Sequence, residues 1–217
     1  PSVVAGPQGR HLVAMALEPL DLVFEERAPS PEVSRFLVKA QRTLEAFTES
    51  RVKDPITGFV ACDFARVWQG LAHVKRAHLA PGNSFLEWGS GLGAVTCLAS
   101  MLGFEASGIE ISQPLVDASE ELAAEYELAA EFVCASYIPE GGEHLVLNEG
   151  DMTWIDTSGP SAYDELGLDI NDFDLICAYP WPGEEHALLD LFDHYASRGA
   201  VFMTYNGVED LRAVRKS

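Results

Sequence analysis

Long apolar runs and paired cysteines are both missing from this 217-residue sequence. No stretch approaches the roughly 18 uninterrupted apolar residues of a bilayer span, so the sequence predicts no membrane-spanning helix. The apolar run at residues 11–24 is interrupted by Glu18 and Asp21 and has no basic leader, so we interpret it as structural rather than as a signal peptide. The four cysteines form no CxxC pair, which argues against the common zinc spacings and against a disulfide framework, and favours a reducing cytoplasm.

Basic residues are scarce. Lys and Arg number 14 against 34 Asp and Glu, which gives a formal net charge of −20. A field of that sign repels phosphate backbones, so nucleic acid is a poor expectation for a partner. A cationic partner, either a basic protein or a small amine, would be attracted instead. The alternative is that the acidity serves only solubility or adaptation to salt.

Hydrophobic periodicity predicts an α/β fold preceded by helices. Residues 1–30 are interpreted as irregular, and apolar residues then recur at helical spacing over 31–50 and about 62–80. Strands and helices alternate beyond, which is typical of a mostly parallel, Rossmann-like doubly wound sheet. The predicted strands cover 84–88, 105–111, 130–135, 172–178 and 199–204, and the predicted helices cover 94–102, 114–126 and 184–196. We therefore divide the chain into a mostly helical extension, 1–82, and a Rossmann-like domain, 83–217. Residues 137–171 are too long for a short loop and are interpreted as an insertion with its own hairpin.

A glycine loop follows the first predicted strand. Glu87-Trp88-Gly89-Ser90-Gly91-Leu92-Gly93 ends that strand and opens a helix, so the backbone can turn sharply and a ligand can approach it closely. The loop also satisfies the dinucleotide pattern GxGxxG/A, which leaves NAD as an alternative ligand. Glu87 favours S-adenosylmethionine (SAM), because a carboxylate suits the ammonium group of SAM and is unfavourable beside a pyrophosphate. Glu110, at the end of the next strand, can accept both ribose hydroxyls of either ligand.

The stretch FLEWGSGLGAVTCLASMLGFEASGIEIS resembles motif I and the following acidic position of class I SAM-dependent methyltransferases. Its Gly-Ser-Gly-x-Gly and Gly-Ile-Glu are also similar to the nucleotide end of Dot1-type lysine methyltransferases. The resemblance covers roughly residues 83–206 and implies a SAM-binding domain. It implies that the methionine part of SAM is lined by Glu87, Gly89, Gly91 and Gly93, and its ribose by Glu110.

The remaining cofactor contacts are expected beside this motif and after the third strand. Ser90 and Ile111 flank the implied contacts and are included among the cofactor-binding residues. The family places a polar or acidic residue after the third strand, at the adenine. Two positions compete for that role in this sequence: Ser136-Tyr137, directly after the strand, and Gly150-Asp151-Met152, within the insertion.

The loop after the fourth strand is expected to face the transferred methyl group, because ligands of open α/β sheets bind at the carboxyl ends of the strands. Ala178-Tyr179-Pro180-Trp181 resembles the Asn/Asp-Pro-Pro-Tyr/Trp motif of amino-group methyltransferases, but Ala178 cannot accept a hydrogen bond from an amine. We predict that Tyr179 and Trp181 form a wall at the methyl group, Tyr179 also touching the cofactor, and that Glu184 is the acceptor or base. Simple packing of the aromatics and a helix-start role for Glu184 and Glu185 are the alternatives.

Two further expectations concern the ends of the domain. By analogy with the family, Phe59, Asp63 and Phe64 are candidates to close over the cofactor, although Asp63 is more simply explained as a helix initiator. The two last strands usual in the family, which form a hairpin, are not recognisable after residue 204. The N-terminal residues then complete the sheet, a partner covers its edge, or the fold is truncated; an uncovered edge favours a homodimer.

The leading hypothesis is therefore SAM-dependent methyl transfer to an unidentified small molecule or protein. A non-catalytic SAM-binding scaffold and an NAD-dependent oxidoreductase are the alternatives, because a fold does not fix a function. No arrangement of histidines or cysteines predicts a metal site.

Overall fold

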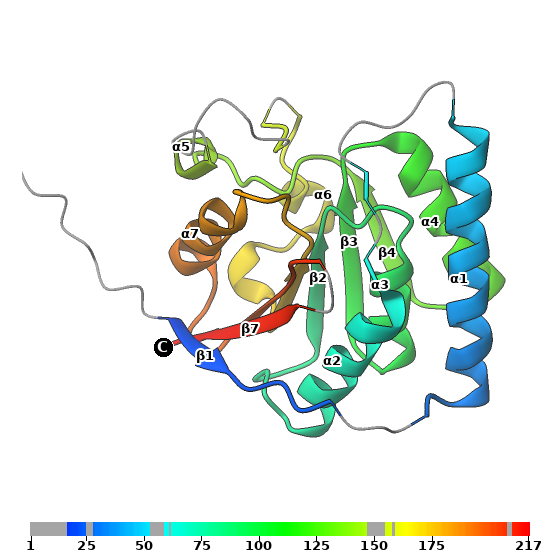
Figure 1. The fold of residues 1–217 in the computed structure, drawn as a ribbon. Coiled ribbons are helices and arrows are strands. Elements are labelled where there is room, and N and C mark those ends of the chain that lie inside the picture. The colour runs from blue at the N-terminus through cyan, green and yellow to red at the C-terminus, as the bar shows by residue number, and fades with distance from the viewer. Residues whose placement is uncertain are drawn as a thin grey trace, which may run out of the picture.

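A seven-stranded sheet forms the centre of the protein, in the order β1-β7-β6-β5-β2-β3-β4 (Figure 1). The computed structural model describes residues 17–24, 28–52, 59–60, 62–146, 155–157, 159–207 and 210–217. The strands are β1 (Leu17–Leu20), β2 (Ser84–Trp88), β3 (Glu105–Glu110), β4 (Ala130–Cys134), β5 (Leu175–Ala178), β6 (Val201–Tyr205) and β7 (Leu211–Lys216). Neighbours among β4, β3, β2, β5 and β6 are parallel, whereas β7 runs antiparallel to both β6 and β1.

Helices cover both faces of the sheet. They are α1 (Pro31–Ser50), α2 (Phe64–Arg76), α3 (Ala94–Met101), α4 (Gln113–Glu125), α5 (Glu143–Val146), α6 (Tyr163–Leu166) and α7 (Glu185–Tyr195), with a 3-10 turn η2 (Ile170–Asp172). One buried cluster packs helices α1, α2, α3 and α4 against Phe85 of β2. The other packs α5, α6 and α7 against Leu86 of the same strand. Alternate residues of one strand thus enter opposite cores, which confirms the α/β architecture. No helix within the described ranges is long and apolar enough to span a bilayer.

The two N-terminal helices begin at capping residues that the sequence provides. Ser30 precedes Pro31, and its hydroxyl accepts a hydrogen bond from the Val33 amide at 3.2 Å. Asp63 caps α2 by accepting from the Arg66 amide at 3.0 Å, so α2 begins two residues later than predicted. It also ends earlier, at Arg76, shortly before His78 adopts a positive φ of 50°.

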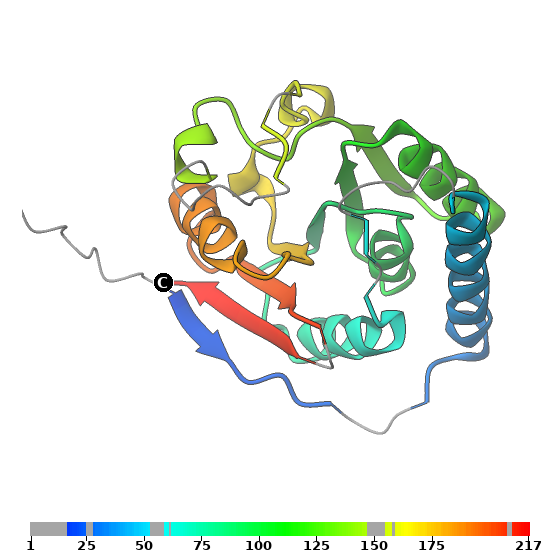
Figure 2. The same cartoon turned by 45° about the horizontal axis from the view of Figure 1, so that its top comes forward.

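The edge beyond β6 differs from the sequence-based prediction. β7 is present there and pairs along its length with β6, so the view that both final strands are missing is wrong. β1 then pairs with β7, so the prediction that residues 17–20 are irregular is wrong. In Figures 1 and 2 the blue strand β1 lies beside the red strand β7 at this edge. Of the three alternatives considered, completion of the sheet by N-terminal residues is the one observed.

The insertion contains short helices where it is described. Within 137–171 these are α5, α6 and η2, and the described residues form a single isolated bridge, Ser136 with Ser161, instead of the predicted hairpin. Residues 147–154 and 158, which include Asp151 and Met152, lie outside the described ranges. The segment returns the chain to β5 and supplies much of the second core.

Candidate functional site

A pocket opens at the carboxyl ends of the parallel strands. Its walls come from the glycine loop after β2, the ends of β3, β4 and β5, the start of α7 and the segment that precedes α2. Figure 2 brings this end of the sheet toward the viewer and shows these loops gathered there. Strands of an open α/β sheet place their ligands at this edge, as expected from the sequence.

The three glycines of the loop share a left-handed backbone but differ in their surroundings. Gly89, Gly91 and Gly93 have φ values of 70°, 55° and 68°. A Cβ at Gly89 would meet nothing within 4 Å, and Gly89 lines the pocket. A Cβ at Gly93 would lie 2.6 Å from Cβ of Ser119 and 2.7 Å from the Phe132 ring, and Gly93 is not among the lining residues. Packing against α4 and β4 therefore explains Gly93, which the resemblance implied would line the methionine part of SAM.

Glu87 lies at the bottom of the pocket with 9% of its surface exposed. Its Oε2 accepts hydrogen bonds from the amide of Thr96 at 2.9 Å and from the Thr96 hydroxyl at 2.6 Å, both in the first turn of α3. Burial raises the pKa of this carboxyl to about 8, although the bonds from Thr96 oppose the rise. The free protein therefore holds a largely protonated Glu87 at neutral pH.

Glu110, at the end of β3, ties the glycine loop to the neighbouring strand. Its Oε2 accepts from the Gly91 amide at 3.0 Å, and its Oε1 accepts from the Ser112 amide at 2.9 Å. Burial raises its pKa above the ordinary value. A carboxylate has about four acceptor sites, so two amide bonds leave capacity for the paired hydroxyls of a ribose.

Ser90 and Ile111 both line the pocket. Ser90 is 5% exposed, and its hydroxyl oxygen is buried without a hydrogen-bond partner. Ile111 is 44% exposed, which is unusual for a large apolar side chain and leaves it available for contact with a flat ligand.

Ser136 lines the pocket, but its hydroxyl already has partners. It donates to the Asp156 carbonyl at 3.0 Å and accepts from the Ile138 amide at 3.2 Å, so it fixes the insertion to the end of β4. Asp156 itself lines the pocket, as does Ile155. Sequence reasoning missed Asp156, because it lies within an insertion where no spacing rule distinguishes it from Asp151.

An aromatic assembly forms the wall between β2 and the insertion. The Trp88 indole stacks on the Tyr137 ring, with centroids 5.6 Å apart and planes inclined by 15°. The Trp88 Nε1 donates to the Tyr163 hydroxyl at 3.1 Å, which in turn donates to the Tyr137 carbonyl at 2.9 Å. Burial, followed by the charge of Glu184, raises the pKa of Tyr137. Tyr137 is thus a neutral, firmly positioned phenol in the pocket, next to Ser136, with which the sequence paired it as a candidate.

The loop after β5 brings the three predicted catalytic residues into the pocket. Tyr179, Trp181 and Glu184 all line it, together with Ala178. The Tyr179 ring packs edge-on against Tyr205 of β6, with centroids 5.1 Å apart. The amide of Trp181 donates to Glu184 Oε2 at 3.1 Å, and the Glu184 amide donates back to the Trp181 carbonyl at 2.9 Å. These reciprocal bonds hold the loop in shape around the Glu184 carboxylate.

The neighbouring acid, Glu185, has a different position. Its carboxylate accepts from the Gly183 amide at 2.9 Å in an exposed bond and is not part of the pocket wall. It is the first residue of α7, where a negative charge stabilises the helix start. Glu184 is the N-cap residue of the same helix, but its side chain makes no cap bond, is 6% exposed and lines the pocket, so the helix-start interpretation fits the side chain of Glu185.

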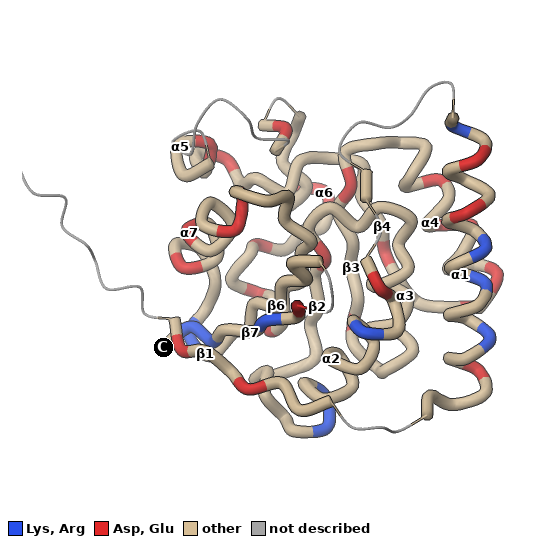
Figure 3. The backbone as a smooth tube through the Cα atoms, viewed as in Figure 1, with Lys and Arg blue, Asp and Glu red and all other residues tan. Residues whose placement is uncertain are grey.

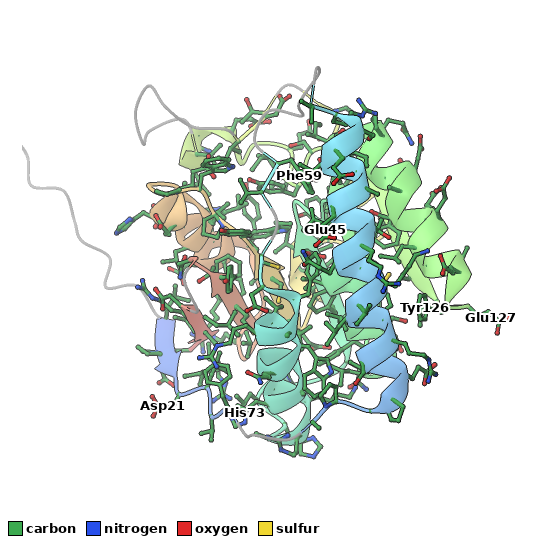
Figure 4. The ribbon with its side chains drawn as sticks, turned by 45° about the vertical axis from the view of Figure 1, so that its right-hand side comes forward. Asp21, Glu45, Phe59, His73, Tyr126 and Glu127 are labelled. Carbon is green, nitrogen blue, oxygen red and sulfur yellow. The ribbon has the colours of Figure 1, made fainter. Side chains whose placement is uncertain are left out.

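The segment before α2 covers the glycine loop. The Phe59 ring lies 3.0 Å from where a Cβ of Gly91 would stand and packs edge-on against Phe47 of α1, with centroids 5.9 Å apart. Figure 4 shows Phe59 beside α1 at the pocket end of the molecule. Phe64 also lines the pocket, but Asp63 does not and serves as the helix cap. Within the described part of the chain, no group of three or more His, Cys, Asp or Glu side chains suits a metal ion.

The sheet topology decides the fold. Five parallel strands in the order β4-β3-β2-β5-β6, a glycine loop directly after β2, and antiparallel β7 beyond β6 form the Rossmann-like arrangement that the resemblance implies. The fold is a Rossmann-like, doubly wound α/β sheet. Beyond β7 the sheet is completed by β1 from the N-terminal region.

Solved structures with similar folds include SAM-dependent methyltransferases. An RNA methyltransferase from Salinibacter ruber in complex with S-adenosyl-L-homocysteine is 18% identical, with a TM-score of 0.44 over 70% of this chain and 87% of its own. The SAM-dependent methyltransferase from Agrobacterium tumefaciens is 14% identical, with a TM-score of 0.43 over 68% of this chain and 46% of its own.

An O-methyltransferase from Bacillus cereus in complex with SAH is also 14% identical, with a TM-score of 0.45 over 75% of this chain and 65% of its own. The chain thus spans less than two thirds of the Agrobacterium and Bacillus proteins. No family model and no curated protein sequence matches the chain. At these identities and TM-scores the likeness concerns the fold, and no substrate follows from it.

Proposed function

We propose that the protein is a SAM-dependent methyltransferase. The observation that carries the proposal is the Glu87 carboxyl, which accepts hydrogen bonds from the amide and the hydroxyl of Thr96 in the first turn of α3. In a dinucleotide-binding fold these N-terminal donors would serve the pyrophosphate. Here an acidic side chain fills that position, which disfavours NAD and favours a ligand with a cationic group.

The ammonium, ribose and adenine groups of SAM each have matching residues in the pocket. The ammonium group of its methionine part would bind at Glu87, whose two bonds from Thr96 both go to Oε2. Its ribose hydroxyls would bind at Glu110, and its adenine would lie near Ile111, Ser136 and Asp156. The sulfonium methyl would then point toward the Tyr179–Glu184 loop. Methyl transfer from a sulfonium depends mainly on holding the donor and acceptor in line, which a rigid pocket provides.

Calorimetric titration with SAM, S-adenosylhomocysteine (SAH) and NAD tests the cofactor. We expect both adenosyl ligands to bind at micromolar concentrations and NAD not to bind. Glu110→Ala should weaken SAH binding by at least about tenfold, because two hydroxyl–carboxylate bonds are lost. Glu105→Ala is the matched control, because Glu105 is an exposed acid at the opposite end of the same strand. Binding of NAD alone would overturn the proposal.

A non-catalytic SAM-binding protein is the second candidate, and Ala178 is the observation that favours it. The amino-group methyltransferase motif has a hydrogen-bond acceptor at this position, and Ala178 lines the pocket without one. Glu184 is the acidic side chain of the same loop that can take the role. Tight SAH binding without methyl transfer to any acceptor would support the second candidate.

A further inference from the structure

Thr96 holds the Glu87 carboxyl at the start of α3. It is fully buried in the first turn of this helix. Gly93, the N-cap of α3, has no side chain that accepts a hydrogen bond, so the amides of the first turn need other partners. Glu87 is such a partner, because its Oε2 accepts from the Thr96 amide at 2.9 Å and from the Thr96 hydroxyl at 2.6 Å. One residue of α3 thus donates twice to one carboxyl oxygen.

The second oxygen of Glu87 is left to the pocket. No described residue donates a hydrogen bond to Oε1, and Oε1 is not one of the fully buried polar atoms that lack a partner. Glu87 lines the pocket, whereas Thr96 does not. A ligand therefore reaches Glu87 but not Thr96, and Thr96 acts on a ligand only through the position and charge of Glu87.

The titratable groups that interact with Glu87 within the described ranges are three thiols and a second acid. Cys177 is paired with Glu87 in the register of β5 with β2, Cys97 lies in α3, and Cys62 lines the pocket just before α2. Burial, followed by the charge of Glu87, raises the pKa of each thiol, so all three are neutral at physiological pH. The charge of Glu110 adds to the rise in the pKa of Glu87. Neither the thiols nor the second acid supply a counter-charge.

Positive charge is also missing from the elements that surround this carboxyl. Between Arg76 and Arg198 the sequence contains no Lys or Arg, and the blue residues of Figure 3 gather on α1 and near α2 and β7. None of the described residues that line the pocket is Lys, Arg or His. The two bonds from Thr96 both lower the pKa of Glu87, so Thr96 is the residue that favours its ionised form.

We propose that Thr96 is a positioning residue of the cofactor site, which holds Glu87 through its amide and hydroxyl so that Oε1 faces the ammonium group of SAM, and which thereby sets the pH range in which the cofactor binds. This inference rests on the proposed function and extends it to the regulation of the same site. Any residue at position 96 except proline has the amide, so the hydroxyl is the part that requires threonine or serine.

The hydroxyl favours cofactor binding through the charge of Glu87. A donor at 2.6 Å stabilises a carboxylate more than a carboxylic acid, because hydrogen bonds to charged groups are the stronger ones. Without this donor the pKa of Glu87 rises further above about 8, and less of the carboxyl is ionised at neutral pH. The ammonium of SAH binds the ionised form. We therefore expect a weaker affinity at neutral pH and a larger proton release for each SAH bound.

Thr96→Val and Thr96→Ser separate the hydroxyl from the methyl group. Valine keeps the shape of threonine and loses the donor, whereas serine keeps the donor and loses a buried methyl group. At pH 8 the unaltered protein should release roughly half a proton per SAH bound, because the pKa of Glu87 is about 8. Thr96→Val should release nearly one proton, and a rise of roughly one pKa unit should lower its SAH affinity at pH 7 about tenfold. Thr96→Ser should match the unaltered protein in both quantities, although its melting temperature should fall.

Calorimetric titration with SAH in two buffers that differ in their enthalpy of protonation measures the proton release. Ser119→Ala is the matched control, because Ser119 is equally buried and donates to the Gly91 carbonyl at 3.0 Å rather than to Glu87. Its proton release should equal that of the unaltered protein. If Thr96→Val does not fold, the comparison of Thr96→Ala with Thr96→Ser replaces it, since both lack the methyl group and differ in the hydroxyl.

The inference would be overturned by an unchanged affinity and proton release in Thr96→Val, by equal changes in the valine and serine variants, or by the same change in Ser119→Ala. The unaltered protein distinguishes this inference from the proposed function. If it binds no SAH, the proposed function fails and the inference fails with it. If it binds SAH and the Thr96 variants do not differ from one another, the inference alone fails.

Discussion

The carboxyl of Glu87 combines two properties that rarely occur together. It is buried among apolar neighbours and lies beside the positive end of a helix, and burial has the larger effect on its pKa. A ligand that brings an ammonium group into the pocket replaces the missing counter-charge and favours the ionised form. Ligand binding and proton release are therefore coupled at this residue.

Binding of SAH should release protons near neutral pH. Because the pKa of Glu87 is raised to about 8 in the free protein, its carboxyl is mostly protonated at pH 7 and loses that proton when the ammonium binds. The affinity should therefore rise with pH up to about pH 8 and then level off. Titrations in phosphate and in Tris buffer should give different apparent enthalpies, because each released proton is taken up by the buffer and the two buffers differ in their enthalpy of protonation.

Glu87→Gln provides the control for this coupling. The amide keeps an oxygen that can accept from Thr96 but cannot ionise, so the difference between the two buffers should shrink toward zero and SAH affinity should fall. A buffer difference that persists unchanged in the variant would assign the released proton to another group.

The contacts of the glycine loop with α4 and β4 determine how closely β2 and α3 pack against these two elements. Gly93 lies where the loop meets α4 and β4, with no room for a side chain, whereas Gly89 lies on the open side of the same loop. Two glycines of one motif thus have separate roles, one in packing and one in leaving space for a ligand.

Alanine at these two glycines should separate stability from binding. Gly93→Ala combines an unfavourable φ with contacts of 2.6 and 2.7 Å, so we expect a loss of about 3 kcal/mol in the free energy of unfolding. That corresponds to a fall of roughly 6–12 °C in the melting temperature. Gly89→Ala adds only the backbone cost of about 1 kcal/mol but places a methyl group on the pocket side and should weaken SAH binding. Thermal unfolding and calorimetry measure the two effects, and equal melting temperatures would contradict the packing role of Gly93.

The parallel core could be predicted from sequence because its strands are buried on both faces and read as short apolar runs between helices. Strands β2 to β6 were all predicted, with ends displaced by a few residues. Glu87 and Glu110 could be selected for the same reason, since each stands near the carboxyl end of such a strand. Asp156 could not be selected, because it reaches the pocket through an insertion whose path follows from tertiary packing.

Strand β7 at the antiparallel edge could not be predicted from the sequence because of its polar residues. β7 has the sequence Leu-Arg-Ala-Val-Arg-Lys, in which Leu211 and Ala213 are buried and three basic residues mask the alternation. Two of those basic side chains bind carbonyl groups at the ends of nearby segments: Arg215 donates to Leu79 at 2.9 Å, and Lys216 donates to Ala196 at 2.7 Å. These partners are distant in the sequence, so no local pattern identifies them.

At the scale of the whole molecule, β1 pairs with the edge of β7 that β6 leaves uncovered. It pairs with β7 over Leu17–Leu20, and both terminal leucines pack against the hydrophobic clusters. The uncovered edge at β6, which was the reason to predict a homodimer, is therefore occupied by two strands of the same chain. Pro19 on the new edge strand also limits further pairing, since proline lacks an amide hydrogen.

Removal of residues 1–20 should expose the β7 edge. Half-burial of Leu17 and Leu20 contributes about 2 kcal/mol, so the melting temperature should fall by roughly 4–8 °C. The unpaired groups of β7 should also promote self-association, which light scattering during size-exclusion chromatography detects. A chain that lacks only residues 1–10 keeps all of β1 and serves as the control. If the longer truncation remains monomeric with an unchanged melting temperature, β1 does not complete the sheet. If it alone associates, the single-chain sheet closure is what keeps this edge from recruiting a second copy.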